Sequence, residues 1–208
     1  MEEKEISQSR ENAVDELAGE PDKPAFVIPE GALAIIPMRN AVLFPGMILP
    51  FTIGREASLL AAQHAVKADC PVGILLQRNP EVEFPGPDDL YTVGTVASIM
   101  RYVTMPDNAH VIVRQGLQRF RVTGYLSGFP FQVASVERIE AAEITDSQIE
   151  ARFVQLKERA MEVMEMLPQA SPELVNAIGS ITSPGALADL VAGMIDIKPA
   201  ERQSVLEA

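Results

Sequence analysis

Few side chains in this sequence could perform acid-base, nucleophilic or metal chemistry. The chain has two histidines, His64 and His110, and a single cysteine, Cys70, which are too few and too scattered for a zinc site. Asp88 and Asp89 are neighbouring carboxylates, but adjacent side chains point apart, and the segment is typical of a turn or a helix cap. The sequence therefore predicts no catalytic residue and no metal ligand in this chain.

The motifs that bind nucleotides are missing as well. Neither the phosphate loop G-x-x-x-x-G-K-S/T nor the dinucleotide pattern G-x-G-x-x-G occurs, and the nucleophile elbow G-x-S-x-G is also absent. We therefore expect this chain to bind no cofactor.

The basic residues Arg101, Arg114, Arg119 and Arg121 form one cluster, on two segments that we expect to be neighbouring strands. Small β-barrels can bind RNA, but few aromatic side chains accompany these arginines for base stacking. Alternation along a solvated strand explains the cluster more simply, so RNA binding is the least supported hypothesis.

Two proline-rich connections contain phenylalanines, at 43–47 (Leu-Phe-Pro-Gly-Met) and at 82–87 (Val-Glu-Phe-Pro-Gly-Pro). Connections run over the surface, so these rings either fold under their loops or form an exposed apolar patch that docks partner chains. The second alternative is our hypothesis for substrate binding. Its candidate contact residues are Phe44, Pro45, Met47, Phe84 and Pro85.

The elements that must position these residues are short strands between proline and glycine. Their β-branched and aromatic composition predicts strands at 32–36, 48–53, 72–77, 92–103, 110–123 and 131–139. Turn residues after the fourth and the fifth strand predict an antiparallel meander. A helix expected at 56–69 should plug one open end of a small barrel.

The apolar periodicity changes at Thr145. Apolar residues then recur every three or four positions, which predicts a long helix that ends before Pro168. Ser-Pro at 171–172, Ser-Pro at 183–184 and Lys-Pro at 198–199 indicate three further helix starts. We expect the apolar pair Val205 and Leu206 to lack a partner within this sequence, and the helical part therefore to be truncated at its C-terminal end.

Charge and composition divide the chain into three regions: 1–23, 24–145 and 146–208. The net charge of −12, from 29 acidic and 17 basic residues, opposes binding to nucleic acid or to anionic membranes. The first region has eight acids and three bases, which predicts a disordered acidic leader. No signal peptide or membrane span is recognisable, and the lone cysteine fits a reducing cytoplasm.

Three blocks of residues occur in an informative order and spacing. They are Ile-Pro-Met-Arg-Asn at 36–40 with Phe-Pro-Gly-Met-Ile-Leu-Pro-Phe at 44–51, Pro-Asp-Asp-Leu-Tyr at 87–91 with Val-Gly-Thr-Val-Ala at 93–97, and Gly-Leu-Gln-Arg-Phe-Arg-Val at 116–122. Together they resemble the N-terminal domain of Lon, the ATP-dependent serine protease. The resemblance is strong over 33–139 and looser in the helical part.

This resemblance implies an α+β fold, in which a PUA-like small β-barrel with one plugging helix precedes an all-α helical subdomain. It also implies that the chain is the front part of a cytoplasmic hexameric protease. The ATPase of that protease, which binds ATP and Mg, and its Ser-Lys dyad would lie downstream, so that this chain itself is non-catalytic. The family role is to recognise unfolded or damaged proteins in protein quality control, and to help organise the hexamer. The expected partners are therefore such substrates and other copies of the chain. The alternatives are a purely structural module for hexamer assembly and, with less support, an RNA-binding domain.

Overall fold

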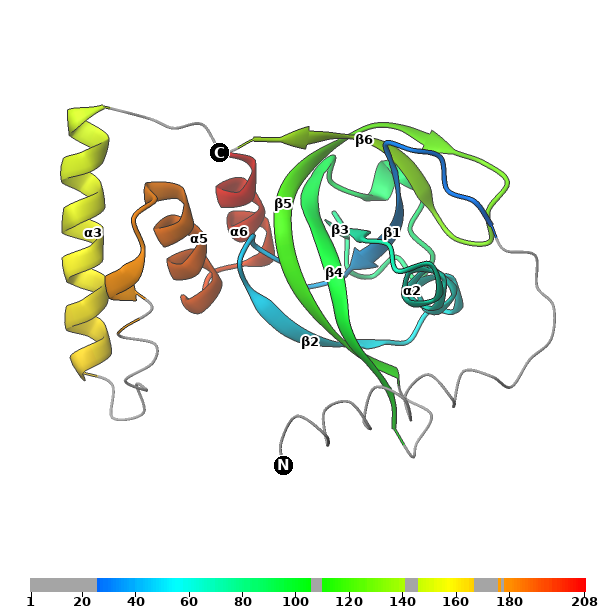
Figure 1. Cartoon of the computed structure of the whole chain (residues 1–208), viewed down its shortest axis with the longest axis horizontal. Coiled ribbons are helices and arrows are strands. Elements are labelled where there is room, and N and C mark those ends of the chain that lie inside the picture. The colour runs from blue at the N-terminus through cyan, green and yellow to red at the C-terminus, as the bar shows by residue number, and fades with distance from the viewer. Residues whose placement is uncertain (1–25, 106–109, 141–145, 167–175, 177) are drawn as a thin grey trace.

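The computed structural model describes residues 26–105, 110–140, 146–166, 176 and 178–208. Three predicted features lie outside these residues: the leader at 1–23, the turn after the fourth strand, and the helix start at 171–172. Figure 1 shows the strands grouped on one side of the molecule and α3 on the other, with α5 and α6 between them.

Six strands form the sheet. They are β1 (Ala32–Met38), β2 (Ile48–Ile53), β3 (Val72–Leu76), β4 (Val93–Thr104), β5 (His110–Leu126) and β6 (Val133–Ile139). Each lies where the sequence predicted a strand. The antiparallel pairs β4–β5 and β5–β6 confirm the predicted meander.

The strand order is β2-β5-β4-β3-β1-β6, and β6 pairs a second time with β5. The pairings from β5 through β4, β3, β1 and β6 therefore close a ring, while β2 lies outside it. β2 lies outside the ring because β5 is long enough to pair with two strands in succession. Residues 110–115 of β5 pair with β2, and residues 119–126 pair with β6. Because β1 and β3 are parallel, the sheet is mixed, and it is not the clean small barrel that was expected.

The first strand is buried on both faces. Ala34 and Ile36 pack into one apolar cluster, whereas Leu33 and Ile35 pack into a second cluster around Phe120. A continuous apolar run is typical of a strand that is covered on both sides. The core therefore lies on both faces of β1.

Phe120 fills the space above a glycine of β4. A Cβ atom on Gly94 would lie 2.2 Å from the carbonyl oxygen of Ile74 and 3.1 Å from the Phe120 ring. Only glycine allows this close approach. Two of the sequence blocks, around 93–97 and 116–122, thus meet in the core.

The predicted helix near residue 56 is α2 (Glu56–Ala68). Its small side chains Ala61, Ala62 and Ala65 are buried against apolar residues of the sheet. The helix ends at Asp69, which has a left-handed backbone with φ 47°. Small residues on one face thus let this helix pack close to the strands.

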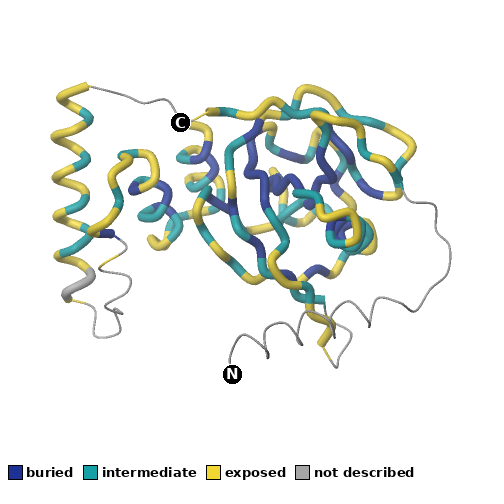
Figure 2. Tube along the Cα trace, viewed as in Figure 1, coloured by how far each residue is buried: buried dark blue, intermediate teal, exposed yellow. Residues whose placement is uncertain are grey.

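Three helices follow the sheet: α3 (Ser147–Met166), α5 (Pro184–Met194) and α6 (Pro199–Glu207). The helix starts predicted at 183–184 and 198–199 are confirmed, because Ser183 caps α5 through Ala186 N and Pro184 and Pro199 open their helices. α3 packs on α5, and α6 packs on β4, so α3 stands away from the sheet with most of its surface exposed (Figure 2). Within the described residues, no helix is long and apolar enough to cross a membrane.

Candidate functional site

The first predicted contact loop, at 43–47, belongs to the core. The Phe44 side chain is fully buried and packs with Ala192 of α5 and Leu206 of α6. The expectation that this ring is exposed is therefore wrong. The cause is a long-range contact, because the loop lies directly on β5: a Cβ atom on Gly116 would lie 2.2 Å from the Phe44 carbonyl oxygen.

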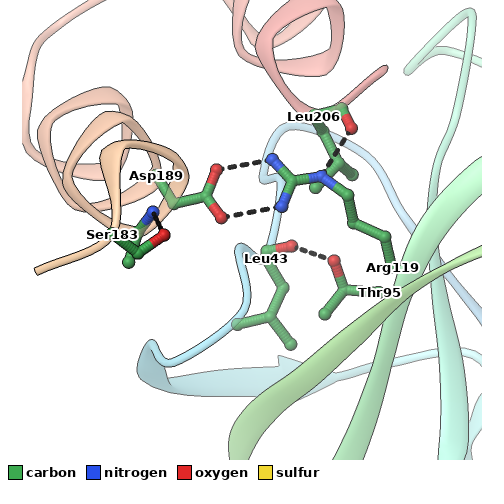
Figure 3. A network of polar contacts seen from close by, with 7 residues as sticks. Leu43, Thr95, Arg119, Ser183, Asp189 and Leu206 are labelled. Atoms are coloured by element: carbon green, nitrogen blue, oxygen red, sulfur yellow. Dashed lines mark hydrogen bonds and ion pairs between the residues drawn. The ribbon is translucent and has the colours of Figure 1, made fainter. Parts of the chain in front are cut away.

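Hydrogen bonds to two strands hold this loop. The Gly46 amide donates to the Gly116 carbonyl at 2.9 Å, and the Gly116 amide donates to the Met47 carbonyl at 2.9 Å. The Thr95 hydroxyl donates to the Leu43 carbonyl at 2.5 Å (Figure 3). The backbone of the loop is thus hydrogen-bonded to the sheet much as a further strand would be.

The other candidate contact residues differ in exposure. Pro45 and Met47 are half-buried. Phe84 is 81% exposed, whereas the neighbouring Pro85 is buried, with its carbonyl accepting a hydrogen bond from Gln132 Nε2 at 2.6 Å. Pro45, Met47 and Phe84 therefore stay predicted contact residues, while Phe44 and Pro85 are covered.

The basic cluster is divided by the fold. Arg114 is fully buried, with its guanidinium carbon 3.9 Å from the centre of the Phe51 ring. Arg119 is engaged by α5 and α6, as described below, whereas Arg101 and Arg121 are exposed. Two of the four arginines are thus occupied within the protein, which weakens the cluster as a phosphate-binding surface.

A polar network joins the sheet to the C-terminal helices (Figure 3). The Arg119 guanidinium donates to both carboxylate oxygens of Asp189, at 2.6 and 2.9 Å, and its Nε donates to the Leu206 carbonyl at 2.9 Å. Burial raises the pKa of the Asp189 carboxyl, while the hydrogen bonds and charge of Arg119 act in the opposite direction. This bidentate pair positions α5 and α6 against β5.

A half-open groove of about 710 Å³ lies on the part of the sheet away from α3. Its walls are the segment 26–31 before β1, the C-terminal half of α2, and residues 130–138 around the start of β6. In Figure 1 the dark-blue segment before β1 runs beside the turn that joins β5 and β6. The groove has the size of a ligand site, which usually spans about 300–1,000 Å³.

Aromatic rings form one wall of this groove. Phe131 lies with its ring centre 6.2 Å from that of Phe26, 6.2 Å from that of Phe129 and 5.5 Å from that of His64. Val27 lines the groove and is 83% exposed. Rigid rings beside an exposed aliphatic side chain suit the binding of apolar groups.

Two ionisable side chains line the groove, and burial shifts the pKa of each toward its uncharged form. Burial lowers the pKa of His64, which favours the neutral imidazole. Burial and the charge of Asp69 raise the pKa of the Cys70 thiol, which favours the uncharged and weakly nucleophilic form. The described residues hold no group of three or more His, Cys, Asp or Glu side chains placed for a metal ion.

Sequence reasoning missed this groove because its walls come from three distant segments. One local signal was available: Phe26, Val27 and Ile28 precede Pro29 outside any predicted strand. This is the same pattern of apolar residues beside proline that drew attention to the Phe44 and Phe84 loops.

Comparisons with known proteins agree with one another. Residues 32–208 match the family described as the substrate-binding domain of ATP-dependent protease La (Lon). The Lon protease of Paraburkholderia phytofirmans is 44% identical over 205 residues, which are 97% of this chain and 26% of that protein. The Lon protease of Phenylobacterium zucineum is 41% identical over 88% of this chain and 23% of that protein.

A solved structure shows the same fold. The N-terminal domain of the Mycobacterium avium complex Lon protease matches with a TM-score of 0.67 and 20% identity, covering 85% of this chain and 90% of that one. The chain spans about a quarter of the length of the curated relatives.

Proposed function

This chain belongs to the family of Lon substrate-binding domains, and we propose that it binds exposed apolar segments of unfolded or damaged proteins. The observation that carries the proposal is the half-open groove with Phe26, Val27 and Phe131 in its walls. Unfolded proteins differ from folded ones in exposing apolar side chains, so a receptor for them needs accessible apolar surface.

The expected binding through one groove is weak. Burying about 100 Å² of apolar surface contributes roughly 2.5 kcal/mol at about 25 cal/mol per Å². Several linked copies could raise the overall avidity by roughly 10² to 10⁴. Weak individual contacts would let a bound substrate chain be released to the ATPase that we propose for the complete protein.

Two side chains of nearly equal exposure allow a matched test. Val27 lies in the groove at 83% exposure, and Phe84 lies on its own loop at 81%. We expect Val27→Ser to weaken binding of a reduced and alkylated, permanently unfolded test protein by about fivefold, because an apolar contact is lost. Biolayer interferometry measures the affinity, and thermal denaturation verifies that each variant is folded.

Phe84→Ser is the control. We expect a smaller loss, since Phe84, like Pro45 and Met47, would be a secondary contact. If only Phe84→Ser weakens binding, the groove is the wrong site and the exposed loop is the receptor. If neither variant changes the affinity, the proposed function fails for this part of the chain.

A second candidate function is assembly with other copies of the chain. Leu156 and Val163 lie seven residues apart on α3 and are exposed, as is Met166 at the end of the helix. Apolar side chains at this spacing are typical of helix pairs. Sedimentation analysis would favour this function if the chain forms oligomers that Val163→Asp dissolves while unfolded proteins are not bound.

The wider context follows from the relatives. We propose that the complete protein is a cytoplasmic, hexameric, ATP-dependent serine endopeptidase of protein quality control, whose ATP and Mg would be bound outside this chain. We also propose that the ring of five strands corresponds to a PUA-like barrel. Detection of ATP-dependent degradation by the complete protein, and its loss without residues 32–208, would test this assignment.

A further inference from the structure

Two unpaired cations stand at the edge of the apolar groove. Lys67 lies in the last turn of α2, Arg138 lies on β6, and both are exposed. Neither side chain forms a hydrogen bond or an ion pair with any residue that the structure describes. They come from two different walls of the same groove.

The other charges that line the groove do not neutralise them. Glu30 is the one acidic residue among the lining residues, and it is exposed and unpaired within the described chain. His64 contributes little positive charge at neutral pH, because burial lowers its pKa. The groove is therefore apolar with a net positive rim, on a chain whose net charge is −12.

We propose that the groove selects apolar segments flanked by acidic side chains, whose carboxylates pair with Lys67 and Arg138. This inference rests on the proposed function and specifies its substrate class. The favoured occupant is an internal stretch of an unfolded chain, with apolar residues on the aromatic wall and a Glu or Asp on either side.

Each cation also has a purely structural explanation. A lysine in the last turn of a helix stabilises the helix dipole, and a charged residue on a strand with a free edge prevents edge-to-edge association. These explanations predict no preference among peptides of different charge. A peptide series therefore separates them from the proposal.

The probes are short fluorescein-labelled peptides with one shared apolar core and amidated C-termini. Their flanking residues are Glu, Gln or Lys: Glu and Gln have the same shape and differ in charge, and Lys reverses the charge. Fluorescence anisotropy with the 208-residue chain measures the affinities. An exposed ion pair changes an equilibrium constant by roughly 1.4- to 5-fold, so we expect the Glu peptide to bind about fivefold more tightly than the Lys peptide at about 20 mM salt. At about 150 mM salt the difference should shrink to about twofold.

Charge reversal supplies the decisive variant. Lys67→Glu with Arg138→Glu should invert the order, so that the Lys peptide binds best. Arg101→Glu with Arg121→Glu is the matched control, because it makes the same change in net charge at exposed residues outside the groove. The control should keep the original order.

Equal affinity of the unaltered chain for all three peptides would overturn the proposal. This comparison uses only the unaltered chain, so it does not depend on whether a variant folds. The same order in both double variants would also overturn it, because the preference would then arise elsewhere. Self-association that disappears in Lys67→Glu with Arg138→Glu would identify a second copy as the occupant, which contradicts the proposal.

The uncharged Gln peptide keeps the two ideas distinguishable. If Val27→Ser weakens its binding while flanking charge has no effect, the groove remains the receptor and only the acidic preference fails. If Val27→Ser leaves its binding unchanged, the proposed function of the groove fails whatever the charges do.

Discussion

Arg114 is a buried charge without a counterion among the residues that the structure describes. Its guanidinium stacks on Phe51 and donates to Met38 Sδ at 3.3 Å, while its Nε and Nη1 atoms have no hydrogen-bond partner in the described structure. Replacing an uncompensated buried charge by an apolar side chain of similar length is often stabilising. We therefore expect Arg114→Met to raise the free energy of unfolding by about 1–3 kcal/mol, measured by urea denaturation. A loss of stability would show that the Phe51 stacking outweighs the desolvation of the charge.

The same residue predicts a dependence on pH. Burial lowers the pKa of Arg114 from its ordinary value to about 9 in the folded chain. Above pH 9 the folded state therefore loses a proton that the unfolded state still holds, and stability from this group rises with pH. The free energies of unfolding of Arg114→Met and of the unaltered chain should therefore become more similar as the pH rises from 8 to 10, which urea denaturation at each pH measures. A constant difference would place the folded pKa above this window.

Phe44 and Phe84 have the same chemistry and opposite environments. Phe44 is fully buried between the sheet and α5, whereas Phe84 is exposed. We expect Phe44→Ala to lower the free energy of unfolding by about 3–5 kcal/mol, because it leaves a cavity. Phe84→Ala should change it by no more than about 0.5 kcal/mol. Chemical denaturation followed by circular dichroism measures both, and similar losses would contradict the burial of Phe44.

At the scale of elements, one ion pair with β5 helps to hold α5 and α6 against the sheet. The Asp189 carboxylate is almost completely buried against Arg119, which also holds the end of α6 through the Leu206 carbonyl. Breaking a buried pair leaves the remaining charge uncompensated. We expect Asp189→Asn to lower stability by about 2–4 kcal/mol and to speed amide exchange in α5 and α6 more than in β4. Uniform acceleration in all elements would show that the helices and the sheet unfold as one unit.

Local patterns predicted the elements well and their contacts poorly. The β-branched runs predicted the six strands, and the Ser-Pro at 183–184 and the Lys-Pro at 198–199 predicted the starts of α5 and α6, because those signals act over a few residues. Nothing local showed that the seventeen residues of β5 would pair with three strands, or that Gly116 would receive the Phe44 loop. The groove could not be predicted for the same reason, since its walls come from α2, β6 and a segment before β1, which are distant in the sequence.

At the scale of the molecule, charge is distributed unevenly along the chain. Residues 1–23 have eight acids and three bases, and residues 146–208 have ten acids and five bases, so 24–145 is nearly neutral. The nearly neutral region contains the groove with its positive rim. An approaching acidic segment thus meets long-range repulsion from the whole chain and short-range attraction at Lys67 and Arg138.

This opposition predicts how the acidic leader affects binding kinetics. Removing residues 2–23 takes away net negative charge without touching the groove walls. Long-range charge acts mainly on association, so the Glu peptide should associate about twofold faster at about 20 mM salt, with little change in its dissociation rate. Stopped-flow anisotropy measures both rates, and at about 150 mM salt the gain should largely disappear because a Debye length of about 8 Å screens the leader. A gain in association rate that is as large at about 150 mM salt as at about 20 mM salt would instead mean that residues 2–23 compete for the groove itself.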